Sequence, residues 1–293
     1  MRTALVLMLL RRAASLAVRT ALRDAVKTLQ RAAVPEPEAS AEWLMAHVLK
    51  ATDRTSVQRA IATKQDLDAT AQAEFEAYID RRLTREPVQY IVGAWAFHDI
   101  ELELAPPTLI PRPETEELVD LVLDWWGPSN KAVFADVGCG SGCLGLALLN
   151  KLPPGSTCRA VDISEEAVAL ATRNAQRLGL AGAYDASLTA ASDLRGAFDF
   201  IVSNPPYIPS RDLATLDAEV ARFEDPRALD GGADGLDVAR VILDGAPAAL
   251  RGARQAVWLE LDPTGPGLLE NPYPGVAAFE DMTGKARFVR VDF

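Results

Sequence analysis

An alternation of short apolar runs with helical segments, which begins near Lys131, constrains the fold of this chain most strongly. After the first apolar run, Ala132–Val137, the apolar residues of Leu144–Leu149 are predicted to lie in a helix. A second helix is predicted over Glu165–Leu178 and ends at Gly179. Strands followed by helices in this order favour a mostly parallel sheet with helices on both faces, which is an α/β fold. Four apolar runs are predicted as strands: Ala132–Val137, Arg159–Ile163, Phe198–Ser203 and Ala256–Leu261.

A glycine-rich turn follows the first predicted strand. Its sequence is DVGCGSG over residues 136–142, and glycines there let the backbone turn tightly and approach a ligand closely. Asp162 ends the next strand, where a carboxylate can accept hydrogen bonds from both hydroxyls of a ribose. The structural alternative is a helix N-cap, for which Asp162 or Ser164 would serve. No lysine follows the glycines as in a phosphate-binding loop, so the turn does not predict a phosphate cradle.

A second motif, Asn204-Pro205-Pro206-Tyr207, follows the strand Phe198–Ser203 and therefore lies at a carboxyl strand end. The two prolines fix the backbone and donate no hydrogen bond, so their carbonyls act only as acceptors. The Asn204 side chain adds a carbonyl oxygen, and Tyr207 can stack on a flat group. Acceptors in this pattern suit a planar NH2 group, although a rigid turn is the plain structural alternative.

Charge and composition limit the partners. The chain has 30 Lys and Arg against 41 Asp and Glu, a net charge of −11, which disfavours binding to nucleic-acid phosphates. No apolar run reaches the ~18 residues that span a bilayer. Cys139 and Cys143, four residues apart, are compatible with redox or metal chemistry, but buried thiols are the favoured interpretation. Cys158 and the lone His47 and His98 receive no role, and no metal site is predicted.

The first 23 residues differ from the rest. They contain five arginines and no acidic residue before Asp24, and the remaining chain has 25 basic against 41 acidic residues, a net charge of −16. Such a start resembles a mitochondrial transit peptide. The apolar run Ala4–Leu10 leaves a secretory signal open, although Arg11 and Arg12 follow it. The third possibility is the first helix of an N-terminal domain.

Residues 24–86 are predicted to form a small helical bundle, since apolar residues recur at helical spacing and Pro35 and Pro37 separate two of its helices. Val88–Val92 and Ile100–Leu104 are predicted as the two strands of a hairpin. A proline-rich loop then leads into a helix over Glu114–Trp126, whose acidic first turn complements the helix dipole.

Together, the glycine turn, Asp162 and the Asn-Pro-Pro-Tyr motif resemble class I S-adenosylmethionine-dependent methyltransferases that act on nitrogen. The segment LIPRPETEELV at 109–119, preceded by REPVQYIVG at 85–93, is similar to the interdomain signature of the HemK/PrmC family, the release-factor glutamine N(5)-methyltransferases. The resemblance implies a Rossmann-like seven-stranded sheet with a small all-α N-terminal domain joined by a β-hairpin.

The resemblance also implies domain limits and partners. A transit peptide would occupy residues 1–23, a helical substrate-docking domain 24–86, a hairpin linker 87–112 and the methyltransferase domain 113–293. The donor would be S-adenosylmethionine, and the substrate the Gly-Gly-Gln loop of a peptide-chain release factor. A monomer with no stable nucleic-acid or membrane binding is expected, in mitochondria or alternatively in the cytoplasm.

By the same resemblance, the Asn204 carbonyl oxygen and the Pro205 carbonyl would hold the glutamine NH2 while Tyr207 packs on the amide. The expected catalytic residues are Asn204, Pro205, Pro206 and Tyr207. The expected cofactor-binding residues are Asp136, Gly138, Cys139, Gly140, Ser141, Gly142, Asp162, Asp193, Leu194 and Asn204. The chain departs from the family pattern at Cys139, at Leu194, where an aromatic residue is common, and in a short Pro- and Gly-rich stretch over 262–276.

Two other functions are compatible with the same motifs. A DNA or RNA amino-group methyltransferase would share the acceptor chemistry, but it would favour a basic stripe or an added recognition domain. A non-catalytic S-adenosylmethionine-binding scaffold would not need the intact motif from Asn204 to Tyr207.

Overall fold

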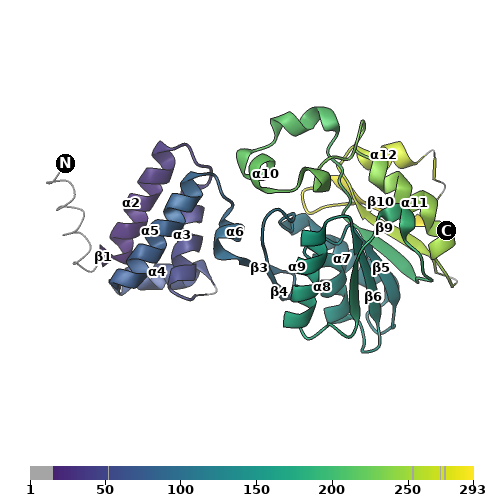
Figure 1. Cartoon of the computed structure of the whole chain (residues 1–293), viewed down its shortest axis with the longest axis horizontal. Helices are drawn as coiled ribbons and strands as arrows, with labels where there is room; N and C mark the ends of the chain where they lie inside the picture. Colours follow the sequence, from purple (N-terminus) through teal and green to yellow (C-terminus); the bar gives the residue numbers. More distant parts are fainter. Residues whose placement is uncertain (1–15, 52, 253, 271, 274) are drawn as a thin grey trace. The chain divides into compact units, whose positions relative to one another are not determined.

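The computed structural model describes residues 16–293 except 52, 253, 271 and 274. The chain divides into two compact units, one ending at Gly93 and the other running from Ala94 to Phe293 (Figure 1). None of the helices in the described ranges combines the length and the apolar character needed to cross a bilayer.

The first unit is a bundle of helices around an apolar core. Asp53 and Asp68 cap two of these helices by accepting hydrogen bonds from the backbone amides of Ser56 and Ala71. A two-stranded ladder joins the start of the unit to its middle, with Leu16 opposite Leu67. Its elements are β1 (Leu16–Ala17), α2 (Val18–Arg31), α3 (Pro37–Val48), α4 (Arg54–Ala62), β2 (Asp66–Leu67), α5 (Ala69–Leu83) and α6 (Val88–Val92).

The prediction of a strand over Val88–Val92 was wrong, because these residues form helix α6. Pro87 precedes the helix, and Gly93 ends it in the left-handed conformation, with φ 76°. Tyr90 and Ile91 are both 4% exposed, so burial on the helical unit outweighs the strand preference of the local sequence. The hairpin lies further along, between β3 (Ala94–Phe97) and β4 (Ile100–Glu103), where Phe97 pairs with Ile100.

Residues 18–23 belong to the folded bundle. Helix α2 begins at Val18, and Val18, Ala21 and Leu22 are buried in the core. Removal of a peptide that ended at residue 23 would therefore take three core side chains with it. A removable segment compatible with this core ends before Val18, and the rest of the predicted transit peptide, residues 1–15, lies outside the described residues.

We expect Leu22→Ala to lower the free energy of unfolding of the helical unit by about 2–5 kcal/mol, because it empties a buried site. Hydrogen exchange of peptides from α2 and α3, followed by mass spectrometry, measures this change. Arg19→Ala, on the exposed face of the same helix, should change it by less than about 0.5 kcal/mol. Equal effects of the two substitutions would show that α2 does not pack as described.

The second unit contains a seven-stranded sheet in the order β10-β11-β9-β8-β5-β6-β7. The five strands from β5 to β9 run parallel, and β11 is antiparallel to both β9 and β10. This arrangement confirms the predicted seven-stranded methyltransferase sheet. Its strands are β5 (Val133–Val137), β6 (Thr157–Asp162), β7 (Tyr184–Leu188), β8 (Phe200–Ser203), β9 (Ala256–Glu260), β10 (Val276–Glu280) and β11 (Ala286–Asp292).

Helices of this unit cover the sheet and connect its strands (Figure 1). The α-helices are α7 (Pro113–Trp126), α8 (Cys143–Lys151), α9 (Glu165–Arg177), α10 (Ala218–Phe223), α11 (Asp237–Ala249) and α12 (Gly265–Leu269). Short 3-10 turns lie at Ala191–Asp193, Ser210–Thr215 and Pro226–Ala228. The Pro- and Gly-rich stretch over 262–276 contains α12, which has only five residues. Leu269 of this helix is nonetheless fully buried, and the outer strands β10 and β11 pair with each other.

Side chains of the central strands alternate between two apolar layers. On one face, Phe134 and Phe200 stack at 4.9 Å between ring centroids, and Trp125 of α7 meets Phe200 edge-on. On the other face, Ile201 and Val257 belong to the core cluster that includes the buried residues of α11. This alternation decides which polar side chains at the strand ends lie on the α7 face.

Candidate active site

A cavity of about 330 Å³ opens at the carboxyl ends of β5, β6 and β8. This is the edge where open α/β sheets bind ligands, and the volume is typical of a small-molecule site. Eight of the predicted site residues line it: Asp136, Gly138, Cys139, Gly140, Ser141, Asp162, Asn204 and Pro206. The sequence motifs far apart in the chain therefore meet in one cavity.

The glycine turn adopts the backbone conformation that its sequence predicts. Gly140 has φ 54°, in the left-handed region, and its amide donates to Asp162 Oδ2 at 2.9 Å. Gly142 has φ 85°, and a Cβ there would come within 2.9 Å of the Tyr184 hydroxyl and of Leu146. Gly140 thus brings the turn against Asp162, whereas Gly142 packs α8 onto the sheet.

Asp136 lies beneath the turn and is 1% exposed. Its Oδ2 accepts from the amide of Gly145 at 2.9 Å, while Oδ1 has no hydrogen-bond partner among the described residues. Burial raises the pKa of this carboxyl to about 7, because the charged form is poorly solvated. Asp136 Oδ1 is therefore a buried acceptor beside the cavity, suited to a ligand that carries a hydrogen-bond donor.

Asp162 is held by two backbone amides and does not cap the following helix. Besides the Gly140 amide on Oδ2, the amide of Ser164 donates to Oδ1 at 2.9 Å. The cap of α9 is Ser164, whose hydroxyl accepts from the amide of Ala167. Burial is the largest cause that raises the pKa of Asp162. Each carboxylate oxygen has a second lone pair, so the side chain can still accept from ligand hydroxyls.

Asn204 lines the cavity directly after β8, and its side-chain amide is oriented by α7. Asn204 Nδ2 donates to Thr115 Oγ1 at 3.2 Å. The Pro-Pro turn that follows is packed from behind by a glycine turn: a Cβ at Gly231 would lie 2.7 Å from the Pro206 carbonyl oxygen, and one at Gly235 would collide with the Tyr207 carbonyl. These close approaches fix the backbone on which Asn204 sits.

Five predicted site residues are absent from the cavity lining: Gly142, Asp193, Leu194, Pro205 and Tyr207. Leu194 packs in the core cluster that includes α11, and Asp193 is exposed, whereas the neighbouring Ala191 and Ser192 line the cavity. Pro205 is buried, and burial raises the pKa of Tyr207 to about 12. The roles given to these five residues stay predictions.

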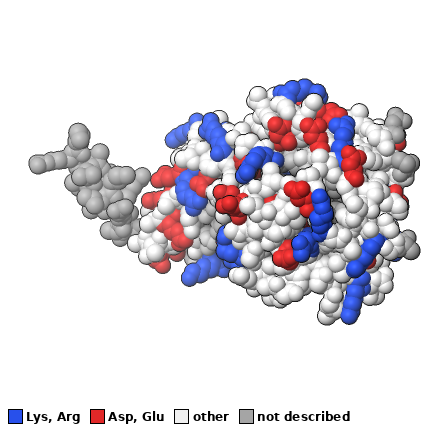
Figure 2. Space-filling model, turned by 45° about the vertical axis from the view of Figure 1, so that its right-hand side comes forward, with Lys and Arg blue, Asp and Glu red and all other residues white. Residues whose placement is uncertain are grey.

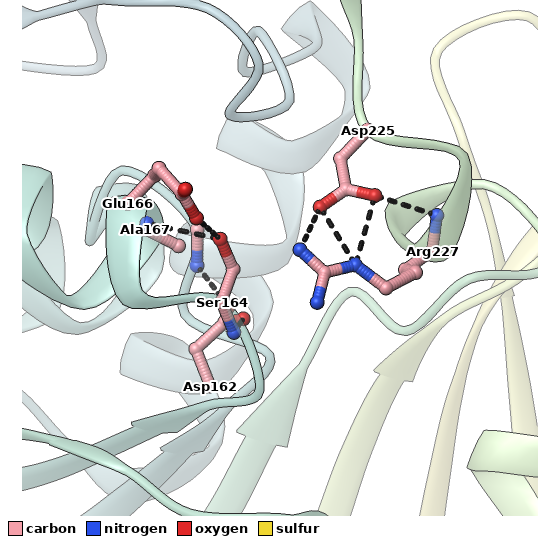
Figure 3. Close-up of polar contacts among 7 residues, drawn as sticks. Asp162, Ser164, Glu166, Ala167, Asp225 and Arg227 are labelled. Atoms are coloured by element: carbon pink, nitrogen blue, oxygen red, sulfur yellow. Dashed lines mark hydrogen bonds and ion pairs between the residues drawn. The ribbon is translucent and has the colours of Figure 1, made fainter.

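Sequence reasoning gave no role to the residues opposite the strand ends. Asp225 and Arg227 line the cavity and form an ion pair, with Arg227 Nη2 and Asp225 Oδ2 2.6 Å apart. Figure 3 shows this pair facing the turn that carries Asp162, Ser164 and Glu166. Their Asp-Pro-Arg sequence carries no chemical signature. Thr108, in the loop before α7, and Thr115, in the first turn of α7, also line the cavity. Of these two, Thr115 lies within the signature at 109–119, which was the available signal for it.

A partly buried ion pair connects the two segments that border the cavity. Arg112 Nη2 and Glu224 Oε2 are 2.6 Å apart, and the Glu224 side chain is only 1% exposed. The amide of Asp225 donates to the Pro107 carbonyl at 2.7 Å beside it. Burial raises the pKa of Glu224, although Arg112 opposes this shift.

The three thiols are poorly suited to nucleophilic or metal chemistry. Cys139 and Cys158 are buried, Cys143 is partly buried, and burial raises the pKa of all three. They are therefore neutral thiols at physiological pH. Among residues 16–293 with the four gaps noted above, no cluster of His, Cys, Asp and Glu could hold a metal ion.

We expect Arg112→Ala to lower the free energy of unfolding by about 3–5 kcal/mol near pH 8, because it leaves the Glu224 carboxylate buried without its partner. The pKa of Glu224 is already raised, and loss of Arg112 raises it further. The folded state then gains a proton as the pH falls, so the loss should be smaller at pH 5 than at pH 8.

Urea unfolding at both pH values measures the effect. Arg211→Ala, which removes an exposed ion pair with Asp212, should cost less than about 1 kcal/mol at either pH. If Arg112→Ala lowers the free energy of unfolding equally at both pH values, the loss does not come from the unpaired Glu224 carboxylate.

Comparisons with known proteins give matches in both units of the chain. A family model described as the PrmC N-terminal domain matches residues 20–93, and one for the methyltransferase small domain matches residues 120–222. A Homo sapiens protein named MTRF1L release factor glutamine methyltransferase is 39% identical over 280 residues, covering 88% of this chain and 82% of its own. A release factor glutamine methyltransferase of Deinococcus radiodurans is 40% identical over 278 residues, covering 93% and 97%.

Solved structures share the fold at low sequence identity. The catalytic domain of hMettl16, solved in complex with an RNA hairpin, matches with a TM-score of 0.50 and 16% identity over 66% of this chain and 75% of its own. At 16% identity, this likeness shows the fold alone. The matches of sequence over nearly the whole length of curated relatives decide the classification: the chain belongs to the release factor glutamine methyltransferase family.

Proposed function

We propose that this chain transfers a methyl group from S-adenosylmethionine to the side-chain amide nitrogen of the glutamine in the Gly-Gly-Gln loop of a peptide-chain release factor. The observation that carries the proposal is the orientation of Asn204. Its NH2 group is engaged by Thr115, so its carbonyl oxygen is the atom left to accept a hydrogen bond from a substrate in the cavity. The family to which the chain belongs supports the choice of substrate.

The residues around the cavity suit the donor. Asp162 would accept from the ribose hydroxyls, and the turn from Gly138 to Gly140 admits a ligand close to the backbone. The unpartnered Oδ1 of Asp136 would face a donor group near the methionine end. When bound, S-adenosylmethionine supplies a methyl group on a positively charged sulfur.

A glutamine amide nitrogen is a poor nucleophile, because its lone pair is delocalised into the carbonyl group. Asn204 Oδ1 and the Pro205 carbonyl would accept its two N–H bonds and hold the nitrogen in line with the methyl group. Most of the acceleration would come from this positioning, for which roughly 7–11 kcal/mol is available in principle. No strong base is required before transfer, and none of the described cavity residues needs that role.

Charge favours a protein substrate over a nucleic acid. The chain carries −11 overall, and Figure 2 shows Lys and Arg interspersed with Asp and Glu on the face in view. A methyltransferase that binds duplex nucleic acid depends on cationic contacts to phosphates. The Gly-Gly-Gln loop of a protein makes no such demand.

We expect Asn204→Ala and Asp162→Ala to separate chemistry from cofactor binding. Asn204→Ala should lower turnover by about 100-fold or more, because the substrate NH2 is no longer held, with the Kd for S-adenosylmethionine changed by less than about threefold. Asp162→Ala should raise that Kd by about 10- to 100-fold through the loss of charged hydrogen bonds.

Calorimetric titration with S-adenosylmethionine gives the Kd, and mass spectrometry of a purified release factor gives methyl transfer to glutamine. Methylation of nucleic acid in place of the release factor would overturn the proposed substrate. Undiminished turnover in Asn204→Ala would overturn the role of the motif.

We also propose that the chain is imported into mitochondria, with the cytoplasm as the alternative. The support is the arginine-rich, acid-free composition before Asp24. Because α2 begins at Val18 and its first turns are part of the core, we expect the mature chain to begin at or before Val18. N-terminal sequencing of the protein recovered from fractionated eukaryotic cells tests this. Recovery of the uncleaved chain in the cytosolic fraction alone would contradict import.

A further inference from the structure

A buried carboxyl group that the proposed reaction does not use lies beside Asn204. Glu260 is the last residue of β9, the strand next to β8, and it is 1% exposed. In β9, Val257 and Leu259 face the α11 layer, so the alternation of the strand directs Trp258 and Glu260 to the α7 layer. Among the described residues, no hydrogen bond of standard geometry reaches either carboxyl oxygen.

Thr115 lies between Glu260 and Asn204. It belongs to the first turn of α7, is 1% exposed, and accepts the hydrogen bond from Asn204 Nδ2 at 3.2 Å. Its own hydroxyl proton needs an acceptor, since a buried hydroxyl left unpaired is costly. The Glu260 carboxyl faces it, and the interaction with Thr115 favours the charged form of that carboxyl.

We propose that Thr115 and Glu260 are positioning residues for the methyl transfer: Glu260 accepts the Thr115 hydroxyl proton, which leaves the Thr115 oxygen to accept from Asn204 Nδ2 and turns Asn204 Oδ1 toward the substrate. This inference rests on the proposed function. It deepens that function by naming what selects one of the two orientations of the Asn204 amide.

The direction of the hydrogen bonds depends on the charge of Glu260. An ionised carboxylate can only accept, so the Thr115 hydroxyl must point to it. A protonated carboxyl can instead donate to Thr115, and the hydroxyl is then free to donate to Asn204 Oδ1. The amide would turn over, and its NH2 group would face the substrate NH2, which cannot accept from it.

The surroundings of Glu260 place this change in the physiological range. Burial raises the pKa of Glu260 to about 7, opposed by Thr115, Arg287 and Arg112 and reinforced by Glu114. Tyr207 and Cys143, which also face the carboxyl, are neutral there because burial raises the pKa of both. Above its pKa the carboxyl is charged and the productive orientation is enforced, so turnover should rise with pH through this range. Asp136 also titrates near pH 7, so a variant of Glu260 is needed to separate the two.

The first test is the pair Thr115→Val and Thr115→Ser in the full chain, with a purified release factor and S-adenosylmethionine. Valine keeps the shape of threonine and removes the hydroxyl. It should lower kcat by about 10- to 100-fold, while the calorimetric Kd for S-adenosylmethionine stays within about threefold of the unchanged protein. Serine keeps the hydroxyl and should retain kcat within about threefold. If both variants lower kcat equally, or if valine retains full kcat, the role of the hydroxyl is overturned.

The second test is Glu260→Gln, with kcat measured from pH 6 to pH 9. The unchanged protein should show a rise with its midpoint near pH 7, and the variant should lose that rise. A rise that persists in Glu260→Gln would assign it to Asp136 and overturn the role of Glu260. Glutamine nearly matches glutamate in size, so this variant keeps the test valid even if Thr115→Val does not fold.

These results also distinguish the inference from the proposed function. Failure of the unchanged protein to methylate any release factor would overturn the proposed function itself. Normal turnover in both Thr115→Val and Glu260→Gln, alongside an inactive Asn204→Ala, would overturn the positioning role alone.

Discussion

The period-two alternation of side chains along β5, β8 and β9 is the constraint on which the site depends. It directs Phe134, Phe200 and Trp258 into the aromatic layer under α7. The same alternation, continued to the strand ends, brings Asp136, Asn204 and Glu260 to that face. Because neighbouring parallel strands end at one edge, three polar groups far apart in sequence lie together. The apolar layer beneath them excludes water, so their charges and hydrogen bonds act more strongly on a ligand.

Desolvation links stability and chemistry in this region. Asp136 and Glu260 are both buried, and burial raises the pKa of each to about 7. Keeping such groups costs free energy of folding that apolar residues would not cost. The Gly145 amide offsets part of this cost at Asp136, and the Thr115 hydroxyl and nearby arginines offset part of it at Glu260. A site built this way has its polar groups oriented before a ligand arrives.

Four strands of the sheet and the chemical motifs could be predicted from the residues, because strongly apolar strands and glycine or proline turns depend on local interactions, whereas the seven-strand count came from the family resemblance. The turn over 136–142, Asp162 and the Asn204 motif could all be placed at strand ends from sequence alone. Helix α6 was mistaken for a strand, because Val88–Val92 has strand-forming residues whose burial on the bundle no local pattern reveals. Glu260 and the Asp225–Arg227 pair were missed for a related reason: their importance comes from what lies opposite them in space.

The ion pair between Arg112 and Glu224 joins residues 112 positions apart in the chain. Closing so long a loop carries an entropic penalty that short-range contacts do not pay. The wall it forms therefore depends on a contact between segments that lie far apart in the chain. A nascent chain that has not yet emerged beyond Glu224 has the glycine turn but lacks the enclosure around it, so the polypeptide acquires its binding competence only when most of its synthesis is complete.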